Sequence, residues 1–171
     1  IMEKVWLGLG SNKGDSSLIL ESAIQELGGF LFELRRSGLW RSRARYYSDQ
    51  QDFLNLAVSG FTNLTPRELL IQIHCIEANH GRDRSKEIKN GPRTLDIDIL
   101  IYDQKIFAEP DLIIPHPGLA ERKFALLPLL ELDYELIHPG LGISLRELAA
   151  CLPPQGIYPV NDNRYDWPYS E

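Results

Sequence analysis

The order of periodic segments along this 171-residue chain restricts its fold more than any other feature. Strand-like alternation is predicted over residues 3–9, 30–41, 53–61 and 95–101, and helix-like spacing of apolar residues over 17–27 and 65–80. This β-α-β-β-α-β order predicts an α+β fold, a ferredoxin-like sandwich whose antiparallel sheet carries helices on one face. Helical segments at 120–132 and 144–153 are expected as C-terminal helical additions. We therefore expect a single domain over residues 1–171, with no readable pattern in its tail from about residue 154.

The helix boundaries carry their own signals. Thr65, Pro66 and Glu68 occupy the N-cap, first-turn and capping-box positions of the second helix. Asp15 or Ser16 can cap the first helix. Both helices are therefore predicted to begin where the strand pattern ends.

Charge and cysteine content exclude several classes of protein. The net charge of −6 and the pI of about 5.3 argue against a general nucleic-acid binder and against an anchor to anionic membranes. Cys75 and Cys151 lack metal-ligand spacing, and two lone cysteines fit a reducing compartment. No apolar run approaches the length of a membrane span, and the first residues lack a signal-peptide pattern. We expect a soluble cytoplasmic protein.

Two aspartates stand on one face of an otherwise apolar strand, residues 95–101. Side chains alternate in a strand, so Asp96 and Asp98 point one way, roughly 6–7 Å apart along the strand. The other face is predicted to carry Leu95, Ile97, Ile99 and Ile101. Because Mg²⁺ prefers one or two carboxylates together with phosphate oxygens, this spacing predicts two Mg²⁺ ions sharing a polyphosphate. The alternative is a pair of solvent-facing aspartates, which is less favoured because Asp is depleted in strands.

A basic segment precedes this strand. Residues 82–93 contain five basic and two acidic residues, a local charge of +3 in an acidic chain. Arg82, Arg84 and Arg93 could supply bidentate donors to phosphate oxygens, and the stretch between them could close as a lid. The alternative is a solvated loop. For Lys86 and Lys89, both a phosphate-binding role and a place in a solvated loop stay open.

A glycine-rich segment and an aromatic–amide pair are further candidates. Residues 8–14 match neither the P-loop nor the dinucleotide template, so we interpret them as a flexible turn. Phe53 and Asn55 share one face of a strand, which suits a flat heterocycle with hydrogen-bonding edges. An amide at a sheet edge explains Asn55 equally well.

Three polar residues could be structural or functional. His74 and Glu77 lie one turn apart on the second helix and share a face. His116 stands between two prolines, which restrict its backbone to extended conformations. Their residue types alone do not decide between the two readings.

In chain order, four motifs closely resemble those of the 6-hydroxymethyl-7,8-dihydropterin pyrophosphokinase family of folate biosynthesis. They are Gly10-Ser11-Asn12, Phe53-Leu54-Asn55, Gly91-Pro92-Arg93-Thr94-Leu95-Asp96-Ile97-Asp98 and Pro115-His116. The resemblance covers about residues 3–150, and the block at 91–98 is its most specific part. It implies a ferredoxin-like fold and transfer of the β,γ-diphosphate of ATP to the hydroxymethyl group of a reduced pterin, releasing AMP, with two Mg²⁺ ions.

The resemblance also implies a role for individual positions. Both Mg²⁺ ions would be held by Asp96 and Asp98. The phosphates would be contacted or covered by Arg82, Arg84, Arg93 and Arg122. The nucleotide site would be lined by His74, Glu77, Ile99 and His116. The pterin would bind Asn55 and lie between Phe53 and Phe124, with Gly10 and Ser42 at the edge of the pocket.

Three departures from the family pattern concern the pterin side. Ser42-Arg43-Ala44 stands where the family usually has a proline-containing segment. Lys89-Asn90 stands where some members have an Arg-Trp pair that covers the pterin, and this loop is one residue longer. We therefore expect weaker stacking on the open face of the pterin.

Two other classes share parts of the pattern. One is a nucleic-acid-binding module, because RNA-recognition domains have this strand order, and the other is a small-ligand regulatory domain without catalysis. The acidic charge and the missing aromatic strand motif favour the enzyme over the first. The expected partners are ATP and a reduced pterin, with neither nucleic acid nor membrane, and we expect a monomer.

Overall fold

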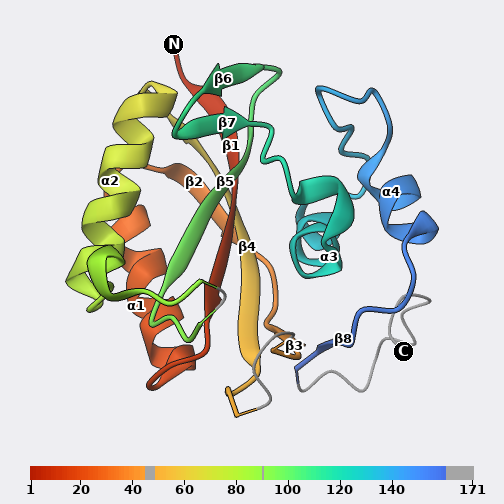
Figure 1. Cartoon of the computed structure of the whole chain (residues 1–171). Coiled ribbons are helices and arrows are strands. Elements are labelled where there is room, and N and C mark those ends of the chain that lie inside the picture. Colours follow the sequence, from red (N-terminus) through yellow and green to blue (C-terminus); the bar gives the residue numbers. More distant parts are fainter. Residues whose placement is uncertain (45–48, 90, 161–171) are drawn as a thin grey trace.

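A computed structural model describes residues 1–44, 49–89 and 91–160. The expectations for residues 45–48, for Asn90 and for the tail 161–171 lie outside the described residues. Figure 1 shows a central sheet with helices on both sides. Its strands are β1 (Glu3–Ser11), β2 (Phe32–Arg36), β3 (Trp40–Ser42), β4 (Phe53–Thr62), β5 (Asp96–Tyr102) and β8 (Ile157–Pro159), while β6 (Phe107–Glu109) and β7 (Leu112–Ile114) form a separate hairpin.

The strand order confirms the ferredoxin-like prediction. The sheet has the order β5-β1-β4-β3-β8, β2 also pairs with β4, and each of these pairs is antiparallel. The first strand and the strand at residues 53–62 are therefore central neighbours, as the β-α-β-β-α-β order requires. The C-terminal strand β8 extends the sheet next to β3.

The helices divide between the two faces of the sheet (Figure 1). One face is covered by α1 (Ser16–Leu27) and α2 (Pro66–Asn79), and the other by α3 (Lys123–Leu132), with α4 (Leu145–Cys151) packed on the outer side of α3. Short 3₁₀ turns are η1 (Arg84–Lys86) and η2 (Leu119–Glu121). The predicted C-terminal helices thus form a second layer. Each face has its own buried cluster, the first around Leu7, Leu56 and Ile73 and the second around Trp40, Leu126 and Leu129.

The helix starts agree with the sequence signals. Thr65 and Glu68 form the complete capping box of α2, with Pro66 in the first turn. Asp15 is the N-cap of α1, and its carboxylate accepts a hydrogen bond from the Leu18 N–H. These local signals therefore place both helices within one residue.

The prediction that Ile101 shares a face with Ile97 and Ile99 was wrong. Trp6 pairs with Ile101 and Leu7 with Ile99, so Leu100 is an extra residue opposite β1. This bulge turns Leu100 and Ile101 toward the α3 face, while Ile97 and Ile99 stay in the cluster beneath α1 and α2. The alternation that places Asp96 and Asp98 on one face ends at the bulge.

The prediction of one strand over residues 30–41 was also wrong. The strand breaks between β2 and β3, and the register shifts between Phe32 and Arg35, where Glu33 has a φ of 51°. Ser37 bridges the break, because its hydroxyl accepts the Ala57 N–H while its own N–H donates to the Ala57 carbonyl. Consequently Phe32 is half exposed rather than part of the core.

Helix α3 is tied to the sheet through indole donors. Trp40 Nε1 donates to Glu131 over 2.6 Å, and Trp6 Nε1 donates to Asp133 over 2.7 Å. The Gly38 N–H donates to the other oxygen of Glu131. Because a buried indole N–H needs an acceptor, these bonds fix the C-terminal end of α3 against β1 and β3.

Candidate active site

A cavity lies between the α3 face of the sheet and the start of α3. Its lining includes nine of the residues predicted from the sequence, which are Gly10, Ser42, Phe53, Asn55, Arg93, Asp96, Asp98, Arg122 and Phe124. They come from β1, β3, β4, β5, α3 and the segments before β5 and α3. The fold therefore brings together residues that are up to 114 positions apart in the chain.

The floor of the cavity includes Gly8 and Gly10 of β1, which have no side chains, and the side chain of Leu100 lies over Gly8. Gly10 pairs with Asn55 on one side and Asp96 on the other, and Gly8 pairs with Ala57 and Asp98. A Cβ at Gly10 would lie 3.3 Å from Asn55 Oδ1. Interpreting these glycines as part of a flexible turn was wrong, because β1 is hydrogen-bonded along both edges and continues to Ser11.

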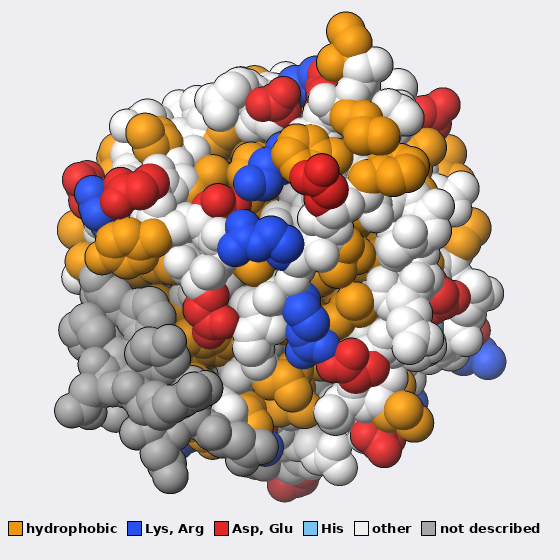
Figure 2. All heavy atoms as spheres, turned by 180° about the vertical axis from the view of Figure 1, so that it is seen from behind, with side chains coloured by type: hydrophobic (Ala, Val, Ile, Leu, Met, Phe, Trp, Pro, Cys, Tyr) orange, Lys and Arg blue, Asp and Glu red, His pale blue; other side chains and the backbone are white. Residues whose placement is uncertain are grey.

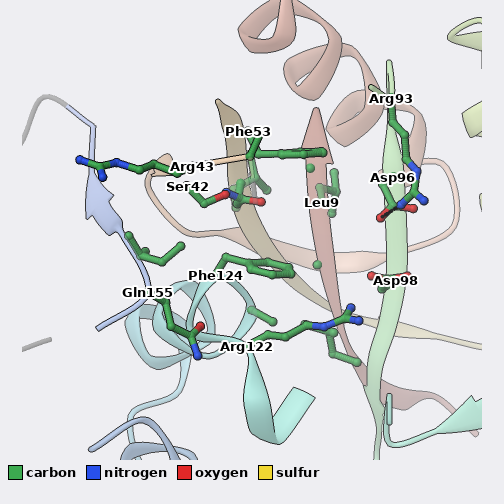
Figure 3. Close-up of a pocket in the computed structure, with 18 of the residues that line it drawn as sticks. Leu9, Ser42, Arg43, Phe53, Arg93, Asp96, Asp98, Arg122, Phe124 and Gln155 are labelled. Carbon is green, nitrogen blue, oxygen red and sulfur yellow. Dashed lines mark hydrogen bonds and ion pairs between the residues drawn. The ribbon is translucent and has the colours of Figure 1, made fainter. Parts of the chain in front are cut away.

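One end of the cavity is aromatic and amide-lined. Asn55 is buried, and its Nδ2 donates to Ser42 Oγ over 2.9 Å and to the Trp40 carbonyl over 3.3 Å. Its Oδ1 lies nearest to the space above Gly10. Figure 3 shows Phe53 and Phe124 reaching into the cavity from opposite sides. This end suits a flat heterocycle with a hydrogen-bond donor on its edge.

The other end carries Asp96 and Asp98, which both face the cavity (Figure 3). A third of the Asp98 side chain is exposed there. Burial and then the charge of Asp96 raise the pKa of Asp98 to about 7, while Arg122 opposes the shift. The charged form of Asp98 is therefore disfavoured in this structure.

This donor set fits Mg²⁺ bound together with a polyphosphate. Among the described residues no group of three or more His, Cys, Asp or Glu side chains could hold a metal ion alone. Two carboxylates that repel each other are the protein ligands Mg²⁺ uses when phosphate oxygens complete its shell. The cation would also supply the charge that Asp98 lacks.

Two arginines contact Asp96. Arg82 Nη1 donates to Asp96 Oδ1 over 2.7 Å, and Arg93 Nη1 lies 3.5 Å from Asp96 Oδ2. Arg82 is almost fully buried and also pairs with Glu77 and Glu87. The Nε of Arg93 is buried without a hydrogen-bond partner in the described part of the chain. Arg93 therefore has a free donor, whereas Arg82 is held in a network.

A second hollow adjoins this network and includes His74, Glu77, Arg82 and Arg84. These four predicted residues do not line the main cavity. Glu77 accepts the Ile97 N–H of the edge strand β5 over 3.1 Å and pairs with Arg84, and burial raises its pKa. Burial, followed by the charge of Arg84, lowers the pKa of His74. Arg82 connects this hollow to Asp96.

His116 and Ile99 lie beside the carboxylates. Nε2 of His116 is 3.7 Å from Asp98 Oδ1, and its Nδ1 accepts the Gly118 N–H over 3.0 Å. Burial and then Arg122 lower the pKa of His116, which favours the neutral ring. Because Nδ1 accepts a hydrogen bond, the proton of that ring is on Nε2, toward Asp98. The Ile99 side chain is packed in the α1/α2 core and lines neither hollow.

Several lining or supporting residues had no predicted role. Asn12 is buried and joins two loops, since its Nδ2 donates to Gln50 Oε1 and its Oδ1 accepts the Arg93 N–H over 2.8 Å. Its place in the motif Gly10-Ser11-Asn12 was the available signal. Gln155 and Ile157 also line the cavity, but they follow the last readable pattern in the sequence.

Comparisons with known proteins point to one family. The model of the 7,8-dihydro-6-hydroxymethylpterin-pyrophosphokinase family matches residues 6–134. The 2-amino-4-hydroxy-6-hydroxymethyldihydropteridine pyrophosphokinase of Aquifex aeolicus is 41% identical over 146 residues, which cover 85% of this chain and 90% of that protein. The protein of the same name from Methylorubrum extorquens is 39% identical over 158 residues, covering 91% of this chain and 98% of that one.

Longer proteins match as well. The folic acid synthesis protein fol1 of Pneumocystis carinii is 37% identical over 159 residues, but the chain spans only 21% of its length. In a solved structure, wild-type HPPK-DHPS of Plasmodium falciparum, the similarity has a TM-score of 0.67 at 18% sequence identity, covering 86% of this chain and 44% of that one. That likeness supports the fold.

Proposed function

Because the chain belongs to the 7,8-dihydro-6-hydroxymethylpterin-pyrophosphokinase family, we propose that it transfers diphosphate from ATP to 6-hydroxymethyl-7,8-dihydropterin and releases AMP. The observation that carries this proposal is that a single cavity has two chemically different ends. Asn55, Phe53 and Phe124 offer a slot for a heterocycle, and Asp96 and Asp98 offer ligands for cations on a polyphosphate. Gly10 of β1 lies between the two ends, paired with Asn55 on one side and Asp96 on the other.

The residues of the cavity would act mainly by positioning. With the pterin held by Asn55, its hydroxymethyl oxygen would point along the floor toward the carboxylates and attack the β-phosphorus, with the AMP oxygen as leaving group. Asp96 and Asp98 would hold two Mg²⁺ ions, which supply positive charge against the phosphate oxygens. Such transfers depend on alignment and charge neutralisation more than on covalent catalysis.

The basic groups around the cavity would bind the phosphates. Arg93 has an unpartnered Nε, and Arg122 extends from the start of α3 toward Asp98 (Figure 3). We propose that Arg82 and Arg84 contribute when the segment 82–93 closes over the nucleotide, which requires Arg82 to exchange its bond to Asp96 for one to phosphate. His116 would present Nε2–H to the nucleotide side of the site.

Further parts of the proposal concern the whole protein. The two clusters share one sheet, which supports a single domain. Two exposed free thiols, Cys75 and Cys151, support a cytoplasmic location. In the described residues no helix has the length and hydropathy needed to cross a membrane.

The direct test is an ATP-dependent AMP release assay with the reduced pterin and Mg²⁺. We expect AMP and pterin diphosphate in equal amounts from the wild type. Asp96→Ala or Asp98→Ala should lower kcat at least about 100-fold, the scale of losing a preorganised electrostatic group. Removal of Mg²⁺ with a chelator should abolish turnover in all variants.

A matched control is Glu135→Ala, which removes an exposed carboxylate paired with Arg146 and lining neither hollow. It should retain wild-type kcat. Near wild-type turnover in both aspartate variants would contradict the metal assignment. Absence of AMP from the wild type would contradict the enzyme proposal itself and would favour a regulatory module.

Nucleic acid is the less supported ligand. The net charge is −6, and on the face shown in Figure 2 Lys and Arg side chains of the described residues are interspersed with Asp and Glu. Nucleic-acid binding draws most of its affinity from basic surfaces. Only the enzyme proposal accounts for the carboxylate pair.

A further inference from the structure

The C-terminal segment supplies a side chain to the start of α3. Gln155 Oε1 accepts the Lys123 N–H over 2.9 Å, and Gln155 Nε2 donates to the Glu121 carbonyl over 2.9 Å. The amide of Gln155 therefore brackets the backbone of Arg122. Figure 3 shows Gln155 beside Arg122 and Phe124 at the edge of the cavity.

These bonds complete a helix end that lacks a local cap. Arg122 is the N-cap residue of α3, and its side chain makes no capping hydrogen bond. The first backbone N–H groups of a helix need acceptors from outside the helix. For Lys123, the first residue of α3, that acceptor is a side chain 32 residues away.

Gln155 is itself held in place by the sheet. It lies two residues before β8, which pairs with β3 so that Ile157 is opposite Ser42. Ile157 is buried in the cluster beneath α3, and the Val160 N–H donates to the Leu39 carbonyl. The segment therefore has a rigid base from which one amide reaches α3.

We propose that Gln155 is a positioning residue for the transfer reaction, acting through Arg122 and Phe124. This rests on the proposed function, in which Arg122 binds phosphate and Phe124 flanks the pterin. Both side chains leave the backbone within one residue of the bracketed peptide groups, so a shift of this turn displaces both together. Gln155 lies outside residues 6–134, so this support is not part of the segment that the family model matches.

The test begins with Gln155→Met, which keeps the length of the side chain and removes both hydrogen-bonding groups. We expect kcat/KM to fall about tenfold. Displacement of Arg122 should lower kcat, and displacement of Phe124 should raise the KM for the pterin. Gln155→Glu keeps an acceptor for the Lys123 N–H but places an oxygen against the Glu121 carbonyl. It should recover part of the loss.

A matched control separates positioning from general stability. Ser144→Ala removes one capping bond, from the Glu147 N–H to Ser144 Oγ, at the start of α4, which does not line the cavity. Its Tm should fall, because N-cap loss costs about 1 kcal/mol, while kcat and both KM values stay at wild type. All assays are run well below the lowest Tm.

Double variants show whether Gln155 acts through its neighbours. In an Arg122→Ala background the effect of Gln155→Met on kcat should largely disappear, and in a Phe124→Ala background its effect on the pterin KM should shrink. Full additivity in both backgrounds, or wild-type kinetics of Gln155→Met, would overturn the proposal.

A measurement that does not depend on catalysis distinguishes a failure of the Gln155 proposal from a failure of the proposed function. Hydrogen exchange over residues 121–126 should be faster in Gln155→Met than in the wild type and unchanged in Ser144→Ala. Unchanged exchange in this segment would overturn the role of Gln155 even if AMP is formed. A wild type that forms no AMP would instead overturn the proposed function.

Discussion

The guanidinium of Arg122 occupies space that only a glycine at position 118 leaves open. A Cβ on Gly118 would lie 2.7 Å from both Cζ and Nε of Arg122. The φ of Gly118 is −89°, so an alanine could adopt this backbone without strain. Glycine is therefore needed at position 118 to leave room for the side chain of Arg122, and not to allow the backbone conformation of the turn.

Gly118→Ala should displace Arg122 and leave the fold intact. The colliding atoms are the end of a flexible side chain, so Tm should change little, while kcat/KM should fall about tenfold. Steady-state kinetics and thermal unfolding measure the two effects. In an Arg122→Ala background the added alanine should have no further effect, and an undiminished loss there would contradict this account.

At the scale of elements, the loop between α3 and α4 depends on a neutral histidine. His138 is 8% exposed, and its Nδ1 accepts the N–H groups of Gly140 and Leu141, each over 3.1 Å. Nδ1 can accept only when it carries no proton. Burial lowers the pKa of His138 in the folded protein below 6.5.

The sign of the resulting pH dependence follows from linkage. The unfolded chain binds the proton more readily, so the contribution of His138 to stability is complete above about pH 6.5 and is lost as the pH falls through the folded-state pKa. His138→Asn retains an acceptor oxygen that does not titrate. The Tm of the wild type minus the Tm of H138N should therefore be larger at about pH 7.5 than at about pH 5. An equal difference at both values would contradict the assignment.

Local signals predicted elements well and interruptions poorly. The capping box at Thr65 and the aspartate at position 15 placed α2 and α1, because caps are satisfied within a few residues. The bulge at Leu100 and the break at Ser37 arise from pairing with β1 and β4, which no local window contains. Gly8 and Gly10 were misread for the same reason.

At the scale of the whole molecule, the two carboxylates of the site have different effects on folding stability. Asp96 gains from its pairs with Arg82 and Arg93, whereas Asp98 lies next to Asp96 with an unfavourable environment for its charge. Two neighbouring carboxylates therefore contribute to folding with opposite sign in the absence of a cation.

Asp98→Asn should raise the Tm in Mg²⁺-free buffer at about pH 8, and Asp96→Asn should lower it. Solvent in the cavity screens the charge of Asp98, so we expect about 1 kcal/mol, or about 2–4 °C in a chain of this size. Both variants should lose AMP release. Thermal unfolding of the three proteins measures the contrast, and a lower Tm for D98N than for D96N would contradict it.

The sequence predicted those residues of the candidate site that belong to a motif whose residue types indicate their chemistry. The block at residues 91–98 and the pair Phe53 and Asn55 identified both ends of the cavity. His74, Glu77 and Arg84 could not be placed in a separate hollow, because this depends on Arg82 bridging to Asp96. Gln155 could not be found at all, since its partners are backbone groups of a distant helix start.

The glycines of β1 limit how this site can be altered. A ligand between the two ends would lie against the backbone of Gly10, whose shape does not depend on the identity of any side chain. A replacement of Gly10 adds atoms beside Asn55 and Phe53, where the substrate would lie, and a replacement of Gly8 presses on Leu100. Adaptation to another substrate would therefore have to come from the surrounding walls. An inhibitor that draws its affinity from this bare backbone would leave the chain few substitutions by which to escape it.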